Sequence, residues 1–440
     1  MATFHDWQRS YGAEAGGVTV TEIRAKFHSP GIQHGNAPCR GSTQQMKIAR
    51  IEDFHVDAGW DTYSFLKITT DDGYSGWSEF KESRRPGLAA LIQGLGATLI
   101  GEDPRAIAKI DAALYSHIRT TAGGLQSNAA GAILNACLDL KGKMLGVPVA
   151  ELFGGPLRDR IPAYWSRCGV MRARWASLFD GNIIDRPAVR SLDDLKRAGR
   201  EACERGFSAL KTNVLVFDQN GGRQYTPGSA RGEGHPELNL PEAIVEALTA
   251  QLRALREGAG PAVRLIVDLN FNYKAEGFRR LARKVEPFDL MWLEMDMYEP
   301  KALSLIRQST STPIGSLETI LGRRALKPYL DHHCVDVAII DPQYNGVPEA
   351  LRMAAMADAY EVNIASHNFS GPLSAVISAQ FASVVPNFRI MELDVDEVPW
   401  KSKLLTHPYR IENGCFVPPA GPGWGTDIDE AVVRAHPAKM

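Results

Sequence analysis

Arg264-Leu-Ile-Val-Asp-Leu-Asn270 is a short apolar run that ends in polar residues, and the same pattern returns further along the chain. It recurs as Met291-Trp-Leu-Glu-Met295, Ile314-Gly-Ser-Leu-Glu-Thr319 and Val335-Asp-Val-Ala-Ile-Ile-Asp341, with amphipathic segments between the runs. Short apolar runs that alternate with amphipathic helices are typical of repeated βα units and a parallel sheet. The pattern therefore predicts an α/β fold for this part of the chain.

The same rhythm extends in both directions and predicts eight strands. They are residues 163–168, 209–214, 264–270, 291–295, 314–319, 335–341, 362–367 and 389–393. Eight parallel strands with intervening helices close into a TIM-type barrel, whose chemistry lies at the strands' carboxyl ends. Two long interruptions, 169–189 and 217–239, leave such ends and are candidate lids.

The residues before the barrel have a different pattern. Residues 46–56, 62–69 and 74–79 alternate like strands, with Asp71-Asp72-Gly73 as a turn, and helical spacing follows from about residue 85 to residue 152. Strands followed by helices predict a compact α+β domain. Residues 1–45 are interpreted as an irregular extension with one strand-like run at 18–27.

Composition narrows the range of partners. The 440 residues are 44% apolar and carry 49 basic against 51 acidic side chains, which excludes a disordered chain. Such balanced charge offers no field for nucleic acid or an anionic membrane. The N-terminus lacks an apolar signal-peptide core and no run of 18 apolar residues occurs, so we expect a cytoplasmic protein. The six cysteines lie far apart and are expected to be reduced and mostly buried.

Polar residues stand at or near the carboxyl ends of the predicted strands. From Asp268 onward the acidic residues and one histidine are spaced by 26, 24, 23, 26 and 25 residues, about one βα unit each. Such spacing places each group at the same height on successive strands, so we expect them to converge. The set is Lys211, Asn213, Asp268, Asn270, Glu294, Glu318, Asp341, His367 and Glu392.

Two chemical functions follow from these residue types. Asp268, Glu294 and Glu318 offer only hard carboxylate oxygens, which favours Mg²⁺ or Mn²⁺ over zinc. Asp341 and His367 fall on adjacent strands, about 4.8 Å apart, so the acid can orient the imidazole as a base. The alternative for His367 is a structural histidine in the core.

This series of residues resembles the mandelate racemase subgroup of the enolase superfamily, and residues 138–155 resemble the last helix of that family's capping domain and the start of its barrel. The resemblance covers about residues 46–440. It implies a modified (β/α)7β barrel with an α+β capping domain, Mg²⁺ on Asp268, Glu294 and Glu318, and abstraction of a proton α to a carboxylate. The implied division is 1–45 extension, 46–160 capping domain, 161–393 barrel, and 394–440 returning to the cap.

Further roles belong to the rim of the barrel. Removing an α-proton requires stabilisation of the developing dianion, which Mg²⁺ and Lys211 can provide. Asn270 lies at the same rim, and in the family the residue matching Glu392 hydrogen-bonds the substrate carboxylate, which requires its protonated form. Loop residues expected to bind the rest of the substrate are Trp60, Arg119, Arg172 and Arg174.

One departure from the family pattern decides between reactions. Members that use bases on both faces carry Lys-x-Lys on the second strand, whereas this chain has Lys211-Thr-Asn213. An amide cannot accept a proton at working pH, so only His367 remains as a base. We therefore expect a Mg²⁺-dependent dehydratase of a sugar acid, aldonate or aldarate, that expels the β-hydroxyl to give a 2-keto-3-deoxy acid.

Two alternatives stay open. One is a racemase, epimerase or cycloisomerase that acts on a carboxylate with the same scaffold. The other is a protein without enzymatic activity, an inactive barrel that only binds a sugar acid or a metal. Dinucleotide chemistry lacks support because no strand leads into G-x-G-x-x-G. The expected partners are a small-molecule sugar acid and further copies of the chain in a homo-oligomer.

Overall fold

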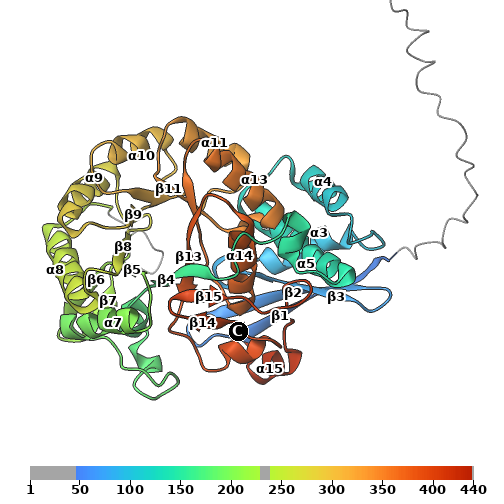
Figure 1. Cartoon of the computed structure of the whole chain (residues 1–440), viewed down its shortest axis with the longest axis horizontal. Helices are drawn as coiled ribbons and strands as arrows, with labels where there is room; N and C mark the ends of the chain where they lie inside the picture. The colour runs from blue at the N-terminus through green and yellow to red at the C-terminus, as the bar shows by residue number, and fades with distance from the viewer. Residues whose placement is uncertain (1–45, 228–237, 439–440) are drawn as a thin grey trace, which may run out of the picture. The chain divides into compact units, whose positions relative to one another are not determined.

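The computed structural model describes residues 46–227 and 238–438. The strand-like run at 18–27 and the middle of the 217–239 loop lie outside these residues. The described residues belong to one compact unit, in which a barrel and a smaller α+β region share contacts (Figure 1).

Eight parallel strands form the barrel, which closes because Met391 on the last strand pairs with Ala163 on the first. The strands are β4 (Ile161–Ser166), β5 (Ala209–Asn213), β8 (Arg264–Asp268), β9 (Trp292–Glu294), β10 (Ile314–Ser316), β11 (Val337–Ile340), β12 (Asn363–Ser366) and β13 (Phe388–Asp394). All eight predicted strands are present, and the barrel predicted from the sequence is confirmed.

Helices follow the first seven strands. They are α7 (Leu192–Glu204), α8 (Glu242–Ala259), α9 (Ala275–Lys284), α10 (Pro300–Arg307), α11 (Arg323–Asp331), α13 (Val347–Asp358) and α14 (Pro372–Val384), with the short α12 (Pro342–Asn345) before α13. The last strand leads instead into β14 (Arg410–Glu412), β15 (Cys415–Val417) and α15 (Glu430–Ala435). This is the modified (β/α)7β arrangement.

The alternation of side chains along the strands explains how the barrel presents its polar groups. Outward residues pack under the helices, whereas inward residues form a separate apolar core that includes Tyr164, Ile266 and Trp292. Side chains two residues apart share a face. Each polar residue accordingly lies two positions after an inward one: Lys211 after Ala209, Asp268 after Ile266, Glu294 after Trp292, Asp341 after Ile339, His367 after Ala365, Glu392 after Ile390.

The α+β region has its own core. Strands β1 (Ile48–Asp57), β2 (Thr62–Thr70) and β3 (Ser75–Phe80) form an antiparallel meander, and they pack against α3 (Leu88–Ala97), α4 (Ile107–Ile118) and α5 (Gly124–Leu145). In Figure 1 this cap lies beside α14 and the C-terminal α15. Trp424 of the C-terminal segment donates its indole N–H to the carbonyl of Trp77 on β3 at 2.8 Å.

The two long loops carry short elements. The first holds α6 (Val170–Arg174), and the second begins with a hairpin of β6 (Leu215–Asp218) and β7 (Gly221–Gln224). Among the described residues no helix is long and apolar enough to span a membrane. The five described cysteines are free, and Cys137, Cys168 and Cys334 are buried.

Candidate active site

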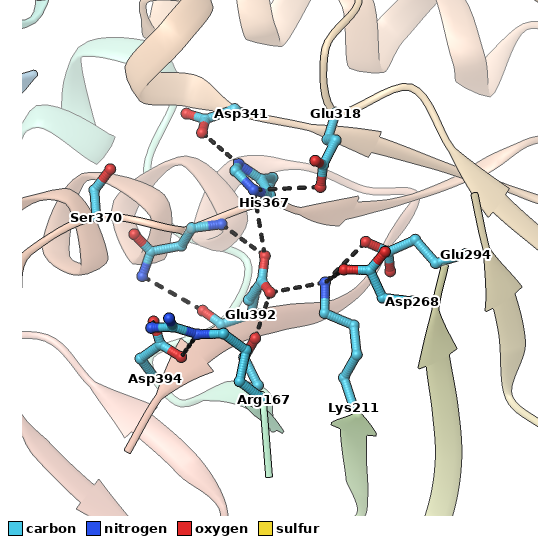
Figure 2. Close-up of polar contacts among 12 residues, drawn as sticks. Arg167, Lys211, Asp268, Glu294, Glu318, Asp341, His367, Ser370, Glu392 and Asp394 are labelled. Atoms are coloured by element: carbon cyan, nitrogen blue, oxygen red, sulfur yellow. Dashed lines mark hydrogen bonds and ion pairs between the residues drawn. The ribbon is translucent and has the colours of Figure 1, made fainter. Parts of the chain in front are cut away.

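A cavity of about 300 Å³ opens at the carboxyl ends of the barrel strands. The residues expected to converge there do so, as Figure 2 shows for the charged groups. Those that line the cavity are Lys211, Asn213, Asp268, Asn270, Glu318, His367 and Glu392. Glu294 and Asp341 are 1% exposed and lie directly behind this lining, in contact with Lys211 and His367.

Lys211 is the central cation of the site. Its Nζ lies 2.8 Å from Glu294 Oε1, 2.8 Å from Glu392 Oε1 and 3.8 Å from Asp268 Oδ2. Burial alone would lower the pKa of this amine, but the Glu294 and Glu392 carboxylates raise it well above the ordinary value. Lys211 therefore stays cationic, which suits stabilisation of negative charge rather than proton abstraction.

Carboxylates outnumber cations around Lys211. Burial raises the pKa of Glu294 to about 8, with repulsion from Asp268 and Glu318 adding to the rise, and it raises the pKa of Glu318 in the same direction. Asp296, which the sequence analysis did not select, also lines the cavity, and burial beside Glu318 and Asp268 raises its pKa well above normal. The signal that could have found it is the inward alternation, which continues from Glu294 to Asp296.

The donor set fits a hard divalent cation. Asp268 and Glu294 are buried at the ends of the adjacent strands β8 and β9, and the half-buried Glu318 follows the next strand, β10. An excess of negative charge in such a site calls for a further cation. Within residues 46–227 and 238–438, no three acidic, histidine or cysteine side chains are gathered closely enough to hold an ion as they stand. Glu294 contacts Lys211 and Glu318 contacts His367 instead.

His367 and Asp341 form the expected pair. His367 Nδ1 lies 2.6 Å from Asp341 Oδ2, while its Nε2 lies 3.3 Å from Glu318 Oε2 (Figure 2). The other Asp341 oxygen accepts the backbone N–H groups of Gln343 and Tyr344 at 2.7 and 2.9 Å, which fixes the carboxylate. Burial alone would lower the pKa of His367, but Glu318 and Asp341 raise it well above normal.

Glu392 is held from three sides. Its Oε1 accepts the Ser166 hydroxyl at 2.5 Å and contacts Lys211, and its Oε2 accepts the Asn368 N–H at 3.0 Å. Burial opposes ionisation, but Lys211 and His367 lower the pKa of Glu392 to about 2. These contacts favour an ionised acceptor, whereas the resemblance implies a protonated donor.

The two asparagines support Asp268. Asn213 Nδ2 donates to the Asp268 carbonyl at 3.0 Å, so this amide occupies the inward position two residues after Lys211. Asn270 donates its backbone N–H and its side-chain N–H to Asp268 Oδ1, both at 2.8 Å. The two bonds from Asn270 orient the Asp268 carboxylate, and the bond from Asn213 fixes the backbone of Asp268.

The expected substrate-binding residues lie in different places. Arg174 lines the cavity and donates to Gln224 at 2.8 Å. Trp60 is 6% exposed and packs behind Phe369, with 5.7 Å between the ring centroids. Arg119 is exposed at the end of α4, away from the cavity lining.

Arg172 does not reach the cavity either. Its buried guanidinium lies 2.9 Å from Asp396 and 2.7 Å from Glu201, because a charge with so little exposure needs charged partners. Residues that sequence reasoning missed at the cavity include Arg85, Arg167, Tyr344 and Phe369. Arg85 and Phe369 stand in loops and Tyr344 stands on α12, so the spacing of the strands could not find them. Arg167 directly follows β4, within the predicted strand 163–168, and its place at the carboxyl end of that strand is the signal that could have found it.

Comparison with known proteins identifies the family. Residues 56–154 match the N-terminal domain of mandelate racemase / muconate lactonizing enzyme, and residues 194–432 match the enolase C-terminal domain-like family. The chain is 27% identical over 408 residues to D-xylonate dehydratase from Haloferax volcanii, covering 90% of each chain. It is 30% identical to D-galactonate dehydratase from Ralstonia nicotianae, covering 88% of this chain and 94% of that one.

Solved structures agree. A protein from Burkholderia xenovorans LB400, described as an L-alanine-DL-glutamate epimerase, is 44% identical with a TM-score of 0.86 and covers 90% of this chain and 99% of that one. A second structure of that protein contains magnesium and fumarate. The chain is an enzyme that belongs to the enolase superfamily, in its mandelate racemase / muconate lactonizing enzyme group.

Proposed function

We propose that this enzyme dehydrates a sugar acid, an aldonate or aldarate, with the help of Mg²⁺. The observation that carries the proposal is the presence of one oriented base, His367 with Asp341, while an amide, Asn213, holds the inward position two residues after Lys211. Relatives at 27–30% identity are named as dehydratases of D-xylonate, D-galactonate and D-gluconate. The Burkholderia relative binds magnesium and a carboxylate, fumarate.

The chain's residues divide the reaction between them. Asp341 holds His367 Nδ1, so Nε2 faces the cavity and takes the proton α to the substrate carboxylate. The Lys211 ammonium stabilises the negative charge that develops on that carboxylate. Mg²⁺ held by Asp268, Glu294 and Glu318 would supply further positive charge when bound.

The same imidazole then completes the elimination. His367, now protonated, gives its proton to the leaving β-hydroxyl, so that the Cβ–O bond breaks and water departs. The electron pair from the α-C–H bond becomes the new C=C bond, and the resulting enol tautomerises to the 2-keto-3-deoxy acid. No second base is needed, because one α-proton leaves and none returns to the opposite face.

Epimerisation is the second candidate, because the relative with 44% identity is described as an epimerase. An epimerase must remove the proton from one face and return it to the other, which requires a second acceptor. Asn213 cannot fill that role, since an amide does not accept a proton near neutral pH. The cavity as it stands therefore favours elimination.

A library of aldonates and aldarates with Mg²⁺ tests the proposal. Wild type should release a 2-keto acid from at least one sugar acid. The control is His367→Asn, which should release that keto acid far more slowly than wild type. Formation of an epimerised substrate without any keto product would overturn the dehydratase assignment and favour the second candidate.

A further inference from the structure

Arg85 reaches the cavity from an ordered turn of the cap. Its backbone N–H donates to the Glu82 carbonyl at 2.8 Å, and the Glu82 carboxylate accepts the N–H groups of Gly87 and Ala89 at 2.8 and 2.7 Å. The Arg85 guanidinium carbon lies 3.9 Å from the centre of the Tyr344 ring. The turn therefore holds this side chain at the cavity wall before any substrate arrives.

Arg85 differs from Lys211 and Arg167 in having no carboxylate partner among the described residues. Lys211 forms ion pairs with three carboxylates, and the Arg167 guanidinium pairs with Asp394, to which Nε donates at 2.9 Å. Arg85 contacts an aromatic face, and among the described residues it forms no ion pair with a carboxylate. A guanidinium that lacks a carboxylate partner is suited to bind one in two parallel hydrogen bonds.

A series of contacts along the cavity wall connects the carboxylate cluster to Arg85. Glu318 contacts His367 at 3.3 Å, and the His367 ring lies 5.4 Å from that of Tyr344. Both the imidazole and the Arg85 guanidinium thus lie within 5.4 Å of the Tyr344 ring centre, on a residue whose backbone is fixed by Asp341. In this series of contacts His367 stands between Glu318 on one side and Tyr344 with Arg85 on the other.

We infer that Arg85 binds a second carboxylate of the substrate, so that the enzyme acts on dicarboxylic sugar acids in preference to aldonates. One carboxylate lies at the Lys211 end, the α-carbon faces His367, and the distal carboxylate meets Arg85. An aldonate ends in a neutral hydroxymethyl group, which leaves the guanidinium without its charged partner. This inference rests on the proposed dehydration and specifies its substrate class.

The test compares each aldarate with the aldonate of the same configuration, in wild-type enzyme with Mg²⁺ and in Arg85→Gln. Wild type should show at least a tenfold higher kcat/KM for its best aldarate. Arg85→Gln should lower kcat/KM for the aldarate by about 100-fold, which is typical of losing one partner of a charged hydrogen-bonded pair. The same variant should lower kcat/KM for the aldonate by less than about threefold, because the aldonate has no second carboxylate to pair with Arg85. Arg85→Lys, which keeps the charge, should recover part of the loss.

Arg324→Gln is the matched control. Arg324 lies on α11 outside this cavity, where its guanidinium carbon is 5.1 Å from the Tyr115 ring, and its loss should not change the aldarate preference. A wild-type preference for aldonates, or an equal loss on both substrate classes in Arg85→Gln, would overturn the inference while dehydration itself stands. Failure to dehydrate any sugar acid would remove the proposed function, and the inference with it.

Discussion

Carboxylates with little exposure occur both at the junction where the cap packs against the rest of the chain and inside the cavity, but their partners differ. At the junction, Asp139 accepts the backbone N–H groups of Trp77 and Trp424, each at 2.8 Å, and contacts Lys143 at 2.6 Å. Burial raises the pKa of both Asp139 and the cavity residue Glu318, which faces His367, but in Glu318 repulsion from Asp268 adds to the rise. The junction carboxylates have their partners within the fold, whereas the cavity carboxylates gather negative charge in excess.

This difference separates a structural use of buried charge from a functional one. A buried carboxylate with full hydrogen bonding stabilises one arrangement of chain segments, and it needs nothing from solution. Carboxylates that repel one another cost free energy unless a cation from solution joins them. We therefore expect cavity substitutions to change turnover with little change in fold, and junction substitutions to do the reverse.

Removal of the metal should give the largest effect. A chelator should abolish turnover, because the carboxylates and Lys211 alone do not stabilise the dianion, and added Mg²⁺ should restore it. The measurement is keto-acid release before and after repletion, with Glu294→Gln as a variant that should need more Mg²⁺ for half-maximal rate. Full activity in a preparation verified as metal-free would contradict the functional reading of the cavity.

Loss of the base comes next. His367→Asn should lower turnover by roughly 100- to 10,000-fold, the range for losing a general base, while the melting temperature stays close to that of wild type. Asp341→Asn should also be damaging, through loss of orientation at Nδ1. If His367→Asn still exchanges the substrate α-proton with deuterated solvent at the wild-type rate, another group is the base.

The predictability of the two regions follows the same division. The cavity residues could be predicted because strand alternation and the repeat of one βα unit force Asp268, Glu294 and His367 to one height. Arg85 and Asp139 could not, since their roles depend on where a cap turn and the C-terminal segment pack, and no periodicity encodes that. Arg172 is the opposite case, because the sequence predicts that this loop arginine binds substrate, whereas its guanidinium forms ion pairs with Asp396 and Glu201.

Glu79 offers a pH test at the junction. Glu79 is 1% exposed, and its carboxylate accepts the N–H groups of Gly371 and Ser374 at the start of α14. Burial raises the pKa of this carboxyl from 4.5 to about 7, although the nearby Lys81 and Lys401 act to lower it. Between these values the folded state keeps a proton that the unfolded state releases, so stability falls as pH rises from 4.5 to 7.

Glu79→Gln removes this dependence. Relative to the variant, wild type should lose about 3 kcal/mol of stability at most over that pH window. Thermal unfolding of both proteins at several pH values measures the difference, in which other titrating groups cancel. If the stability difference between the two proteins is constant from pH 4.5 to 7, Glu79 does not take up a proton on folding. A large drop in kcat for folded Glu79→Gln would contradict the distinction between structural carboxylates at the junction and functional carboxylates in the cavity.

The smallest expected effect is a gain of activity at Asn213. Asn213→Lys places an amine on the same inward face as Lys211, two residues away, where the amide now donates to the Asp268 carbonyl. Two amines so close depress each other's pKa, which leaves one of them able to accept a proton near neutral pH.

Wild type should incorporate solvent deuterium into recovered substrate only with retention of configuration, and the variant should gain slow exchange or epimerisation at the α-carbon. Asn213→Met, which removes the amide and adds no amine, is the matched control. Epimer formed by the unmodified enzyme would mean that a second base already acts in the cavity, and the argument from a single base would fail.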